Sequence, residues 1–225
     1  MSFQRSALGG LGDNHWVRRQ GKAEDSNSTV RLTLAVTGAS GAVFAVEMLR
    51  ALDADVRVER VDFIASEAAL RVFAEEMGLS GRNGLVAKLL GAKGKGAKVV
   101  QHAEADIGAT VASGSYRSDG MIVLPCTMGT LAGIANGMAS NLIERAADVC
   151  LKEGRRLVLC VRETPFNRIH LRNMQLAADA GATIFPMMPV MYNLPKDTTE
   201  MARQFVDRVL AFVGLSQAGA FEWGE

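Results

Sequence analysis

The sequence predicts a single α/β domain built on a doubly wound parallel sheet of the Rossmann-like (flavodoxin-like) class. Three observations support this prediction. Runs of β-forming residues alternate with segments of helical periodicity along most of the chain. Gly-rich turns separate several of these runs from the helices that follow. The length of 225 residues fits one core and does not require a second domain.

The first part of the pattern begins near Val30. Residues 32–36 form an apolar run that ends in the Gly-rich turn GASG, and AVFAVEMLRAL then has apolar residues at helical spacing. VRVERVDFIAS predicts a second strand with a turn at Ser66, and EAALRVFAEEMG predicts a helix that ends near Gly78. A helical patch, LVAKLLG, precedes the strand KVVQ, and we interpret the loop GAKGKGAK between them as a solvent-exposed connection.

The second part contains the clearest buried strand, which covers residues 121–124 and leads to Pro125. Residues 130–147 predict a helical stretch with a break near residues 135–141. RRLVLCVRE and ATIFPMMP predict two further strands, and RIHLRNMQLAADAG between them predicts a helix closed by Gly181. TTEMARQFVDRVLAFVG predicts a final amphipathic helix that begins with a Thr-x-x capping pattern. Because helices separate the strands, we expect parallel pairing.

The N-terminal residues differ from the rest of the chain. Residues 1–28 mix Gly, Asn, Ser, Gln and charged residues without a period. This composition predicts a disordered or loosely docked extension, and residues 29–225 are assigned to the folded domain.

Composition excludes several classes of function. The formal net charge of +1, from 25 basic and 24 acidic residues, gives no general reason to bind nucleic acid or an anionic membrane. No apolar run approaches the roughly 20 residues that cross a bilayer, and the N-terminus lacks the apolar core of a signal peptide, so we expect a cytoplasmic protein. Cys126, Cys150 and Cys160 are widely spaced in apolar stretches and predict buried thiols. With only three histidines, the sequence predicts no metal site.

Two motifs indicate a binding site at the carboxyl ends of the strands, where ligands bind in sheets of this kind. The turn from Gly38 to Gly41 suits a phosphate at a helix N-terminus, although it lacks the GxGxxG spacing and a tight strand-to-helix connection explains it equally well. PCTMGT offers backbone N–H groups and the hydroxyls of Thr127 and Thr130, which suit a phosphate or a flavin ring edge. The alternative is ordinary N-capping by Thr127.

Charged residues follow in a dense stretch. Arg145 and Lys152 lie two helical turns apart, and the pair Arg162 and Glu163 comes at the carboxyl end of a buried strand. Any one of these residues reads as an ordinary surface charge. A charged pair at the end of a buried strand favours a functional site.

The order of TGASG, ASGS, PCTMGT, NLIERAADVCLKEGRRLVLCVRETPFNRIHLRNM and AGATIFPMMPVMYN resembles the UbiX flavin prenyltransferases. These belong to a wider flavin-dependent family that also includes cysteine decarboxylases. The likeness covers about residues 32–223, and the unbroken stretch 141–174 is its most specific part. It implies noncovalent binding of FMN and transfer of a dimethylallyl group from dimethylallyl phosphate to N5 and then C6 of reduced FMN. The product, prenylated FMN, would serve a UbiD-type decarboxylase in ubiquinone biosynthesis or aromatic acid decarboxylation.

The resemblance also implies roles for individual residues. The implied flavin site consists of Gly38, Ala39, Ser40, Ser66, Thr127, Met128, Gly129, Thr130 and Arg145. The implied prenyl phosphate site consists of Lys152, Arg162, Tyr192 and Arg208. A monophosphate is a poor leaving group, so cations and a phenol would stabilise the departing phosphate without a metal. Ser40, Glu76, Lys152 and Glu163 are the implied catalytic residues: Glu163 would pass a proton to the phosphate, and Ser40 would relay the proton of flavin N5.

The sequence departs from the family pattern at one point. The family often has an aromatic residue shortly before ASGS, whereas this chain has Ile107 in DIGATVASGS. Such a residue would shield a prenyl cation, so the change leaves the choice between a monophosphate and a diphosphate donor open. Trp223 near the C-terminus remains as an aromatic candidate.

Two other functions remain as alternatives. A flavin-dependent cysteine decarboxylase would carry a histidine after the first strand–helix unit and a PASANT-like loop, but no histidine occurs between His15 and His102 and the loop reads PCTMGT. An FMN-binding carrier or partner subunit of a decarboxylase would keep the flavin site alone.

The composition also bears on assembly. The hydrophobic content of 48% with 11 methionines predicts subunit contacts, hence a homo-oligomer. The resemblance implies a dodecamer in which Glu76, Tyr192 or Arg208 completes a neighbour's pocket.

Overall fold

The computed structural model describes residues 29–220 and contains one parallel sheet in that part of the chain. Its strand order is β3-β2-β1-β4-β5-β6. The strands are β1 (Val30–Val36), β2 (Val58–Ala65), β3 (Val99–Ala103), β4 (Gly120–Cys126), β5 (Arg156–Val161) and β6 (Thr183–Ile184). The parallel pairing and the Rossmann-like class predicted from the sequence are confirmed.

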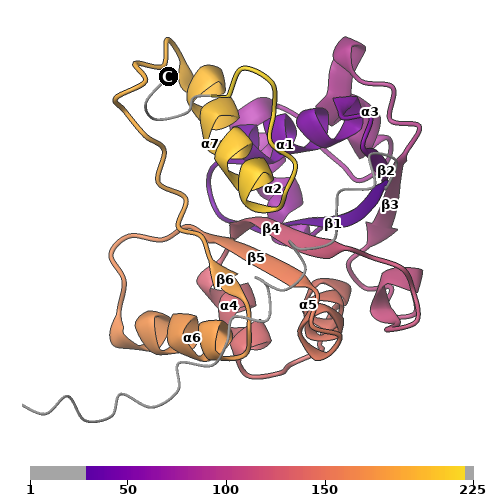
Figure 1. Cartoon of the computed structure of the whole chain (residues 1–225), viewed down its shortest axis with the longest axis vertical. Helices are drawn as coiled ribbons and strands as arrows, with labels where there is room; N and C mark the ends of the chain where they lie inside the picture. The colour runs from indigo at the N-terminus through magenta and orange to yellow at the C-terminus, as the bar shows by residue number, and fades with distance from the viewer. Residues whose placement is uncertain (1–28, 221–225) are drawn as a thin grey trace, which may run out of the picture.

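Helices cover both faces of the sheet (Figure 1). One face carries α1 (Ala42–Ala54), α2 (Glu67–Met77), α3 (Leu85–Leu90) and α7 (Thr198–Phe212). The other carries α4 (Met128–Ala135), α5 (Leu142–Lys152) and α6 (Arg168–Asp179). Two short 3-10 helices, η2 (Gly91–Lys93) and η3 (Thr110–Ala112), lie in the connections before and after β3.

Each face of the sheet has its own apolar core because successive residues of a strand point to opposite faces. On β1, Leu34 packs with the α1 and α7 layer, whereas Ala35 packs with the α4 and α5 layer. Both side chains are fully buried. The ring of Phe205 on α7 makes edge-to-face contacts with Phe44 of α1 at 5.5 Å and with Phe185 after β6 at 5.6 Å between centroids. The contact with Phe44 docks α7 onto α1, and the contact with Phe185 docks α7 onto the chain after β6.

Most predicted boundaries agree with the structure, but one strand is shorter than expected and one helix has a different capping residue. The expected break between residues 135 and 141 separates α4 from α5. The strand expected in ATIFPMMP covers only Thr183–Ile184, although Phe185 N and Met187 N still donate hydrogen bonds to the Leu159 and Val161 carbonyls of β5 at 2.9 Å. Helix α7 is capped by Asp197 rather than by a threonine, because the Asp197 side chain accepts a hydrogen bond from Glu200 N.

The three cysteines are free and buried, as predicted. Burial raises the pKa of the Cys126 and Cys150 thiols to about 12, so both are protonated at neutral pH. The predicted N-terminal extension, residues 1–28, lies outside the described residues.

Candidate active site

The carboxyl ends of all the strands meet at one edge of the sheet because every pairing is parallel. Strand β1 pairs with β2 on one side and with β4 on the other, and the helices after β1 and β4 lie on opposite faces. This is the topological switch point, where a crevice opens between the two outgoing loops. The loops after β1 and β4 are those that carry GASG and PCTMGT.

Thr37 joins these two loops. Its Oγ1 donates a hydrogen bond to the Pro125 carbonyl at 2.8 Å and accepts one from Thr127 N at 2.8 Å. The side chain is buried, with 2% of its surface exposed. The sequence analysis did not single out Thr37. Its position directly after a buried strand is the feature that could have indicated a hydroxyl contact between the loops.

The loop after β1 needs glycine for two reasons. A Cβ on Gly38 would lie 2.3 Å from the Cβ of Ala68 in α2, so the backbone and this helix approach too closely for a side chain. Gly41 has a φ of +118°, a conformation that L side chains rarely adopt. The GASG turn is therefore a close-packed strand-to-helix connection.

Glu76 reaches this turn from α2. Its Oε2 accepts hydrogen bonds from Ala42 N at 2.7 Å and from Gly41 N at 3.0 Å, at the N-terminus of α1. Burial raises the pKa of the Glu76 carboxyl, but hydrogen bonds from the Ser40 side chain and the two N–H groups, with the nearby charge of Arg162, hold it below its ordinary value. The structure thus brings Ser40, Glu76 and Arg162 together.

The predicted flavin contacts after β2 and β4 sit at helix N-termini. Ser66 is buried and caps α2, since its Oγ accepts a hydrogen bond from Ala69 N at 3.0 Å. Thr127 caps α4 in the same way by accepting from Thr130 N at 3.2 Å, so the N-capping interpretation is correct. Capping leaves the N–H groups of Met128 and Gly129, in the first turn of α4, without partners inside the helix.

Arg145 lies in the first turn of α5, on the opposite face of the sheet from α1 and α2. One of its terminal nitrogens lies 2.9 Å from Oδ2 of Asp148. The guanidinium has five donors, so this ion pair leaves several for a ligand.

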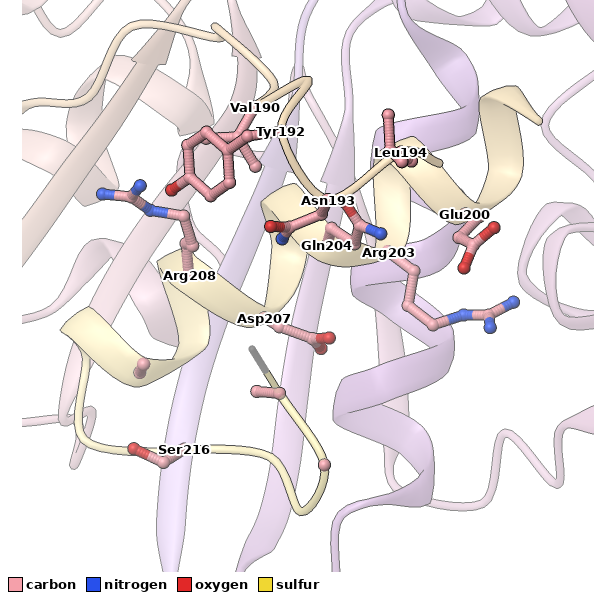
Figure 2. Close-up of a pocket in the computed structure, with 13 residues that line it drawn as sticks. Val190, Tyr192, Asn193, Leu194, Glu200, Arg203, Gln204, Asp207, Arg208 and Ser216 are labelled. Carbon is pink, nitrogen blue, oxygen red and sulfur yellow. The ribbon is translucent and has the colours of Figure 1, made fainter. Parts of the chain in front are cut away.

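The chain after β5 and β6 supplies the predicted phosphate ligands. Arg162 and Glu163 directly follow β5 and are exposed, and Glu163 Oε1 accepts a hydrogen bond from Thr164 N at 2.9 Å. Tyr192 and Arg208 line one groove of about 720 Å³ between α7 and the loop after β6. They lie together at one end of this groove (Figure 2).

The chain is similar in sequence to known flavoproteins. The family model described as Flavoprotein matches residues 20–214. The flavin prenyltransferase UbiX of Alkalihalophilus pseudofirmus is 42% identical over 197 residues, which cover 86% of this chain and 96% of that protein. The chain belongs to the UbiX flavin prenyltransferases of the flavoprotein family.

Solved UbiX-type structures resemble the whole described fold. A dodecameric FMN-dependent UbiX-like decarboxylase from Escherichia coli O157:H7 has a TM-score of 0.78 at 40% identity, covering 87% of this chain and all of its own. AnUbiX (PadA1), in complex with FMN and dimethylallyl pyrophosphate, has a TM-score of 0.77 at 38% identity, covering 88% of this chain and 98% of its own.

Lys152, the remaining residue of the predicted phosphate site, lies away from Arg162. Lys152 ends α5 beside Glu153, whose Oε1 is 2.5 Å from the lysine nitrogen. It also adjoins Gly114, which precedes β4, so it lies at the amino edge of the sheet. Arg162 follows the carboxyl end of β5, and a strand of 6 residues rises roughly 20 Å. Within one chain of this UbiX relative, Lys152 and Arg162 are therefore at opposite edges.

The position at which the resemblance led us to expect an aromatic residue lies between β3 and β4. Ile107 there is 59% exposed, so its side chain can meet a ligand or a second chain. Trp223 and His15 lie outside the described residues.

Two searches of residues 29–220 bear on other chemistry. No group of three or more His, Cys, Asp or Glu residues in this range is arranged to hold a metal ion. No helix in the same range is both long and apolar enough to cross a membrane.

Proposed function

We propose that this chain is a flavin prenyltransferase that transfers a dimethylallyl group from dimethylallyl phosphate to N5 and C6 of reduced FMN. The observation that carries the proposal is the grouping of Ser40, Glu76 and Arg162 beside the switch point of the sheet. This grouping combines a hydroxyl, a carboxylate and a cation where a flavin edge and a phosphate would meet.

The first step breaks the bond between the prenyl C1 carbon and the phosphate oxygen and forms a bond from C1 to N5. Arg162, Arg208 and the Tyr192 hydroxyl stabilise the negative charge that develops on the phosphate. Glu163, beside Arg162, supplies the proton that the leaving phosphate accepts. N5 gives up its proton as this first bond forms. The second bond joins the prenyl C3 carbon to C6: the alkene carbon C2 gains a proton, C6 loses one, and Ser40 with Glu76 forms the route for these protons.

Flavin binding uses the outgoing loops of β1, β2 and β4. The N–H groups at the first turn of α4 bind acceptor atoms of FMN, and Ser66 and Arg145 donate from opposite faces of the sheet. The full set proposed to contact the flavin is Gly38, Ala39, Ser40, Ser66, Thr127, Met128, Gly129, Thr130 and Arg145.

Lys152 requires an oligomer if it acts on the same phosphate as Arg162, because the two lie at opposite edges of one chain. The proposed assembly is a homo-oligomer of the dodecameric type reported for the E. coli relative. In it, Lys152 of one subunit reaches the Arg162 of another. The protein acts in the cytoplasm, and a UbiD-type decarboxylase receives the prenylated FMN.

The test is anaerobic incubation of the protein with reduced FMN and dimethylallyl phosphate, followed by mass analysis of the extracted flavin. A mass gain of one five-carbon prenyl unit supports the transferase. A parallel reaction with dimethylallyl diphosphate identifies the preferred donor. Tightly bound but unchanged FMN with both donors would contradict the proposal and favour an FMN carrier.

A further inference from the structure

Glu104 connects two helices that carry proposed flavin contacts. It is the first residue after β3, at the carboxyl edge of the sheet. Its Oε2 accepts a hydrogen bond from Glu67 N at 2.9 Å, and Glu67 is the first residue of α2, directly after Ser66. Its backbone carbonyl accepts a hydrogen bond from Leu142 N at 2.8 Å, and Leu142 begins α5, the helix of Arg145.

This link crosses the sheet. Helix α2 packs on the face with α1, and α5 packs on the opposite face. Ser66 and Arg145 therefore belong to different layers, and a ligand that contacts both depends on how the first turns of these two helices are spaced. Glu104 bonds to both first turns, through its side chain on one side and its backbone on the other.

The segment that carries Glu104 is anchored by a buried carboxylate, Asp62. Asp62 of β2 is 1% exposed, and its Oδ1 lies 2.8 Å from Nε2 of His102, close before Glu104 in the chain. Its Oδ2 accepts a hydrogen bond from the Tyr116 hydroxyl at 2.7 Å, at the other end of the connection between β3 and β4. Arg60 adds two further hydrogen bonds to Oδ1, at 3.0 and 2.9 Å.

The charge state of Asp62 suits this anchoring role. Burial raises the pKa of its carboxyl, but hydrogen bonds from His102, Arg60 and Tyr116 together hold it below the ordinary value. The carboxylate is ionised at neutral pH and binds the two ends of the connection at once. A segment fixed at both ends holds Glu104 in a defined position.

We propose that Glu104 is a positioning residue of the flavin site, which sets the spacing between Ser66 and Arg145 and thereby the affinity for FMN. The inference rests on the proposed flavin contacts of these two residues, and it does not depend on prenyl transfer. Glu104 acts through the first turn of α2 and does not contact the ligand.

The test compares FMN dissociation constants, measured without prenyl donor by quenching of flavin fluorescence, among three variants. Glu104→Gln keeps an acceptor oxygen at the same reach and loses the charge, so its affinity stays within about twofold of the parent. Glu104→Asp keeps the charge but is one methylene shorter, and Glu104→Ala has no acceptor. Both lose the bond to Glu67 N, and we expect FMN binding about tenfold weaker, the order of one intramolecular hydrogen bond.

Asp106→Ala is the matched control. Asp106 is an exposed acid of the same connection, and its Oδ1 accepts a hydrogen bond from Gly108 N within the loop. This variant removes a nearby negative charge without touching α2 or α5, so its FMN affinity stays unchanged. Thermal unfolding of each variant is measured in parallel without FMN.

A double-mutant cycle shows whether Glu104 acts through Ser66. If it does, Glu104→Ala lowers FMN affinity in the parent and has little further effect in a Ser66→Ala background. Full additivity of the two losses overturns the proposal. So does parent-like binding by Glu104→Ala, or weak binding by Glu104→Gln with normal binding by Glu104→Asp, which would indicate a charge effect.

Failure of this inference is separable from failure of the proposed function. Weakened FMN binding in Glu104→Ala and Glu104→Asp with no prenylated product from the parent supports positioning and rejects transfer. If the parent forms prenylated product but both variants have an unchanged FMN dissociation constant, the transferase function is supported and the positioning role of Glu104 is rejected. If Glu104→Ala does not fold, the Gln and Asp pair decides, because each retains a polar side chain at the same position.

Discussion

The Oε2 atom of Glu76 lies 2.7 Å from the backbone nitrogen of Ala42, so a carboxylate from α2 closes the N-terminus of α1. An unpaired helix N-terminus has a partial positive charge, which a carboxylate stabilises. The same N-terminus follows GASG, the turn that the sequence analysis assigned to the flavin. Glu76 therefore links the packing of two helices to the geometry of the site.

Replacing Glu76 by Gln should destabilise the fold by about 1 kcal/mol at neutral pH, because the charge at the helix N-terminus is lost. The folded-state pKa of Glu76 is lowered, so its contribution is present above the ordinary value of 4.5 and is lost as the pH falls through the lower folded value. Urea unfolding of parent and variant at several pH values measures this. A stability difference that persists unchanged in strong acid would contradict the charge-based explanation.

Gly38→Ala should destabilise the protein by about 2 kcal/mol, because the added methyl overlaps the Cβ of Ala68 at 2.3 Å and α2 must move. FMN binding should weaken as well, since α2 carries Ser66 and Glu76. The control is Gly108→Ala, where the nearest atom to the new Cβ is 3.5 Å away, and its stability should be unchanged. Equal unfolding midpoints for the two variants would show that the loop after β1 shifts to accommodate the added methyl group without loss of stability, which would contradict this prediction.

Tyr116→Phe should destabilise the fold by about 2 kcal/mol, since it removes a hydrogen bond to an ionised, buried carboxylate. The Tyr116 hydroxyl stays protonated and donates this hydrogen bond, because burial and the neighbouring Asp62 carboxylate raise its pKa to about 12. The pKa of Asp62 is lowered on folding, so this contribution is lost as the pH falls below the ordinary aspartate range. Urea unfolding at neutral and at acidic pH checks both points, and an equal loss at both would argue against an ionised Asp62.

The sheet and the convergence of its loops could be predicted because apolar runs define the strands and parallel pairing brings their carboxyl ends to one edge. The hydrogen bond between Glu76 and the N-terminus of α1 could not be predicted. A glutamate on an amphipathic helix gives the same sequence pattern whether its side chain faces solvent or a helix N-terminus. Glu104 and Thr37 were missed for the same reason, since their partners are distant in sequence. The position of Lys152 was available from topology: a helix that precedes a parallel strand ends at that strand's amino end.

Glu163→Gln should leave the FMN dissociation constant unchanged and lower the rate of prenyl transfer by about 10²-fold or more, the usual effect of removing a general acid. The amide has nearly the same volume but cannot give a proton to the leaving phosphate. Single-turnover assays of prenylated FMN, at saturating FMN and donor, measure the chemical step. A parent-like rate would remove Glu163 from the acid role and leave Arg162 and Arg208 as the groups that stabilise the phosphate.

Mixing two inactive variants tests the placement of Lys152 and Arg162 at opposite edges of one chain. Lys152→Ala and Arg162→Ala should each abolish most transfer when every subunit carries the change. In mixed oligomers, random assembly pairs an intact Lys152 of one subunit with an intact Arg162 of another in about a quarter of composite sites, so roughly that share of activity should return. The control mixes Arg162→Ala with Arg162→Ala Lys152→Ala, which contains no intact Arg162 and should stay inactive. Absence of recovery in the first mixture, with co-assembly shown by tagged pull-down, would mean that Lys152 does not join Arg162 across a subunit boundary.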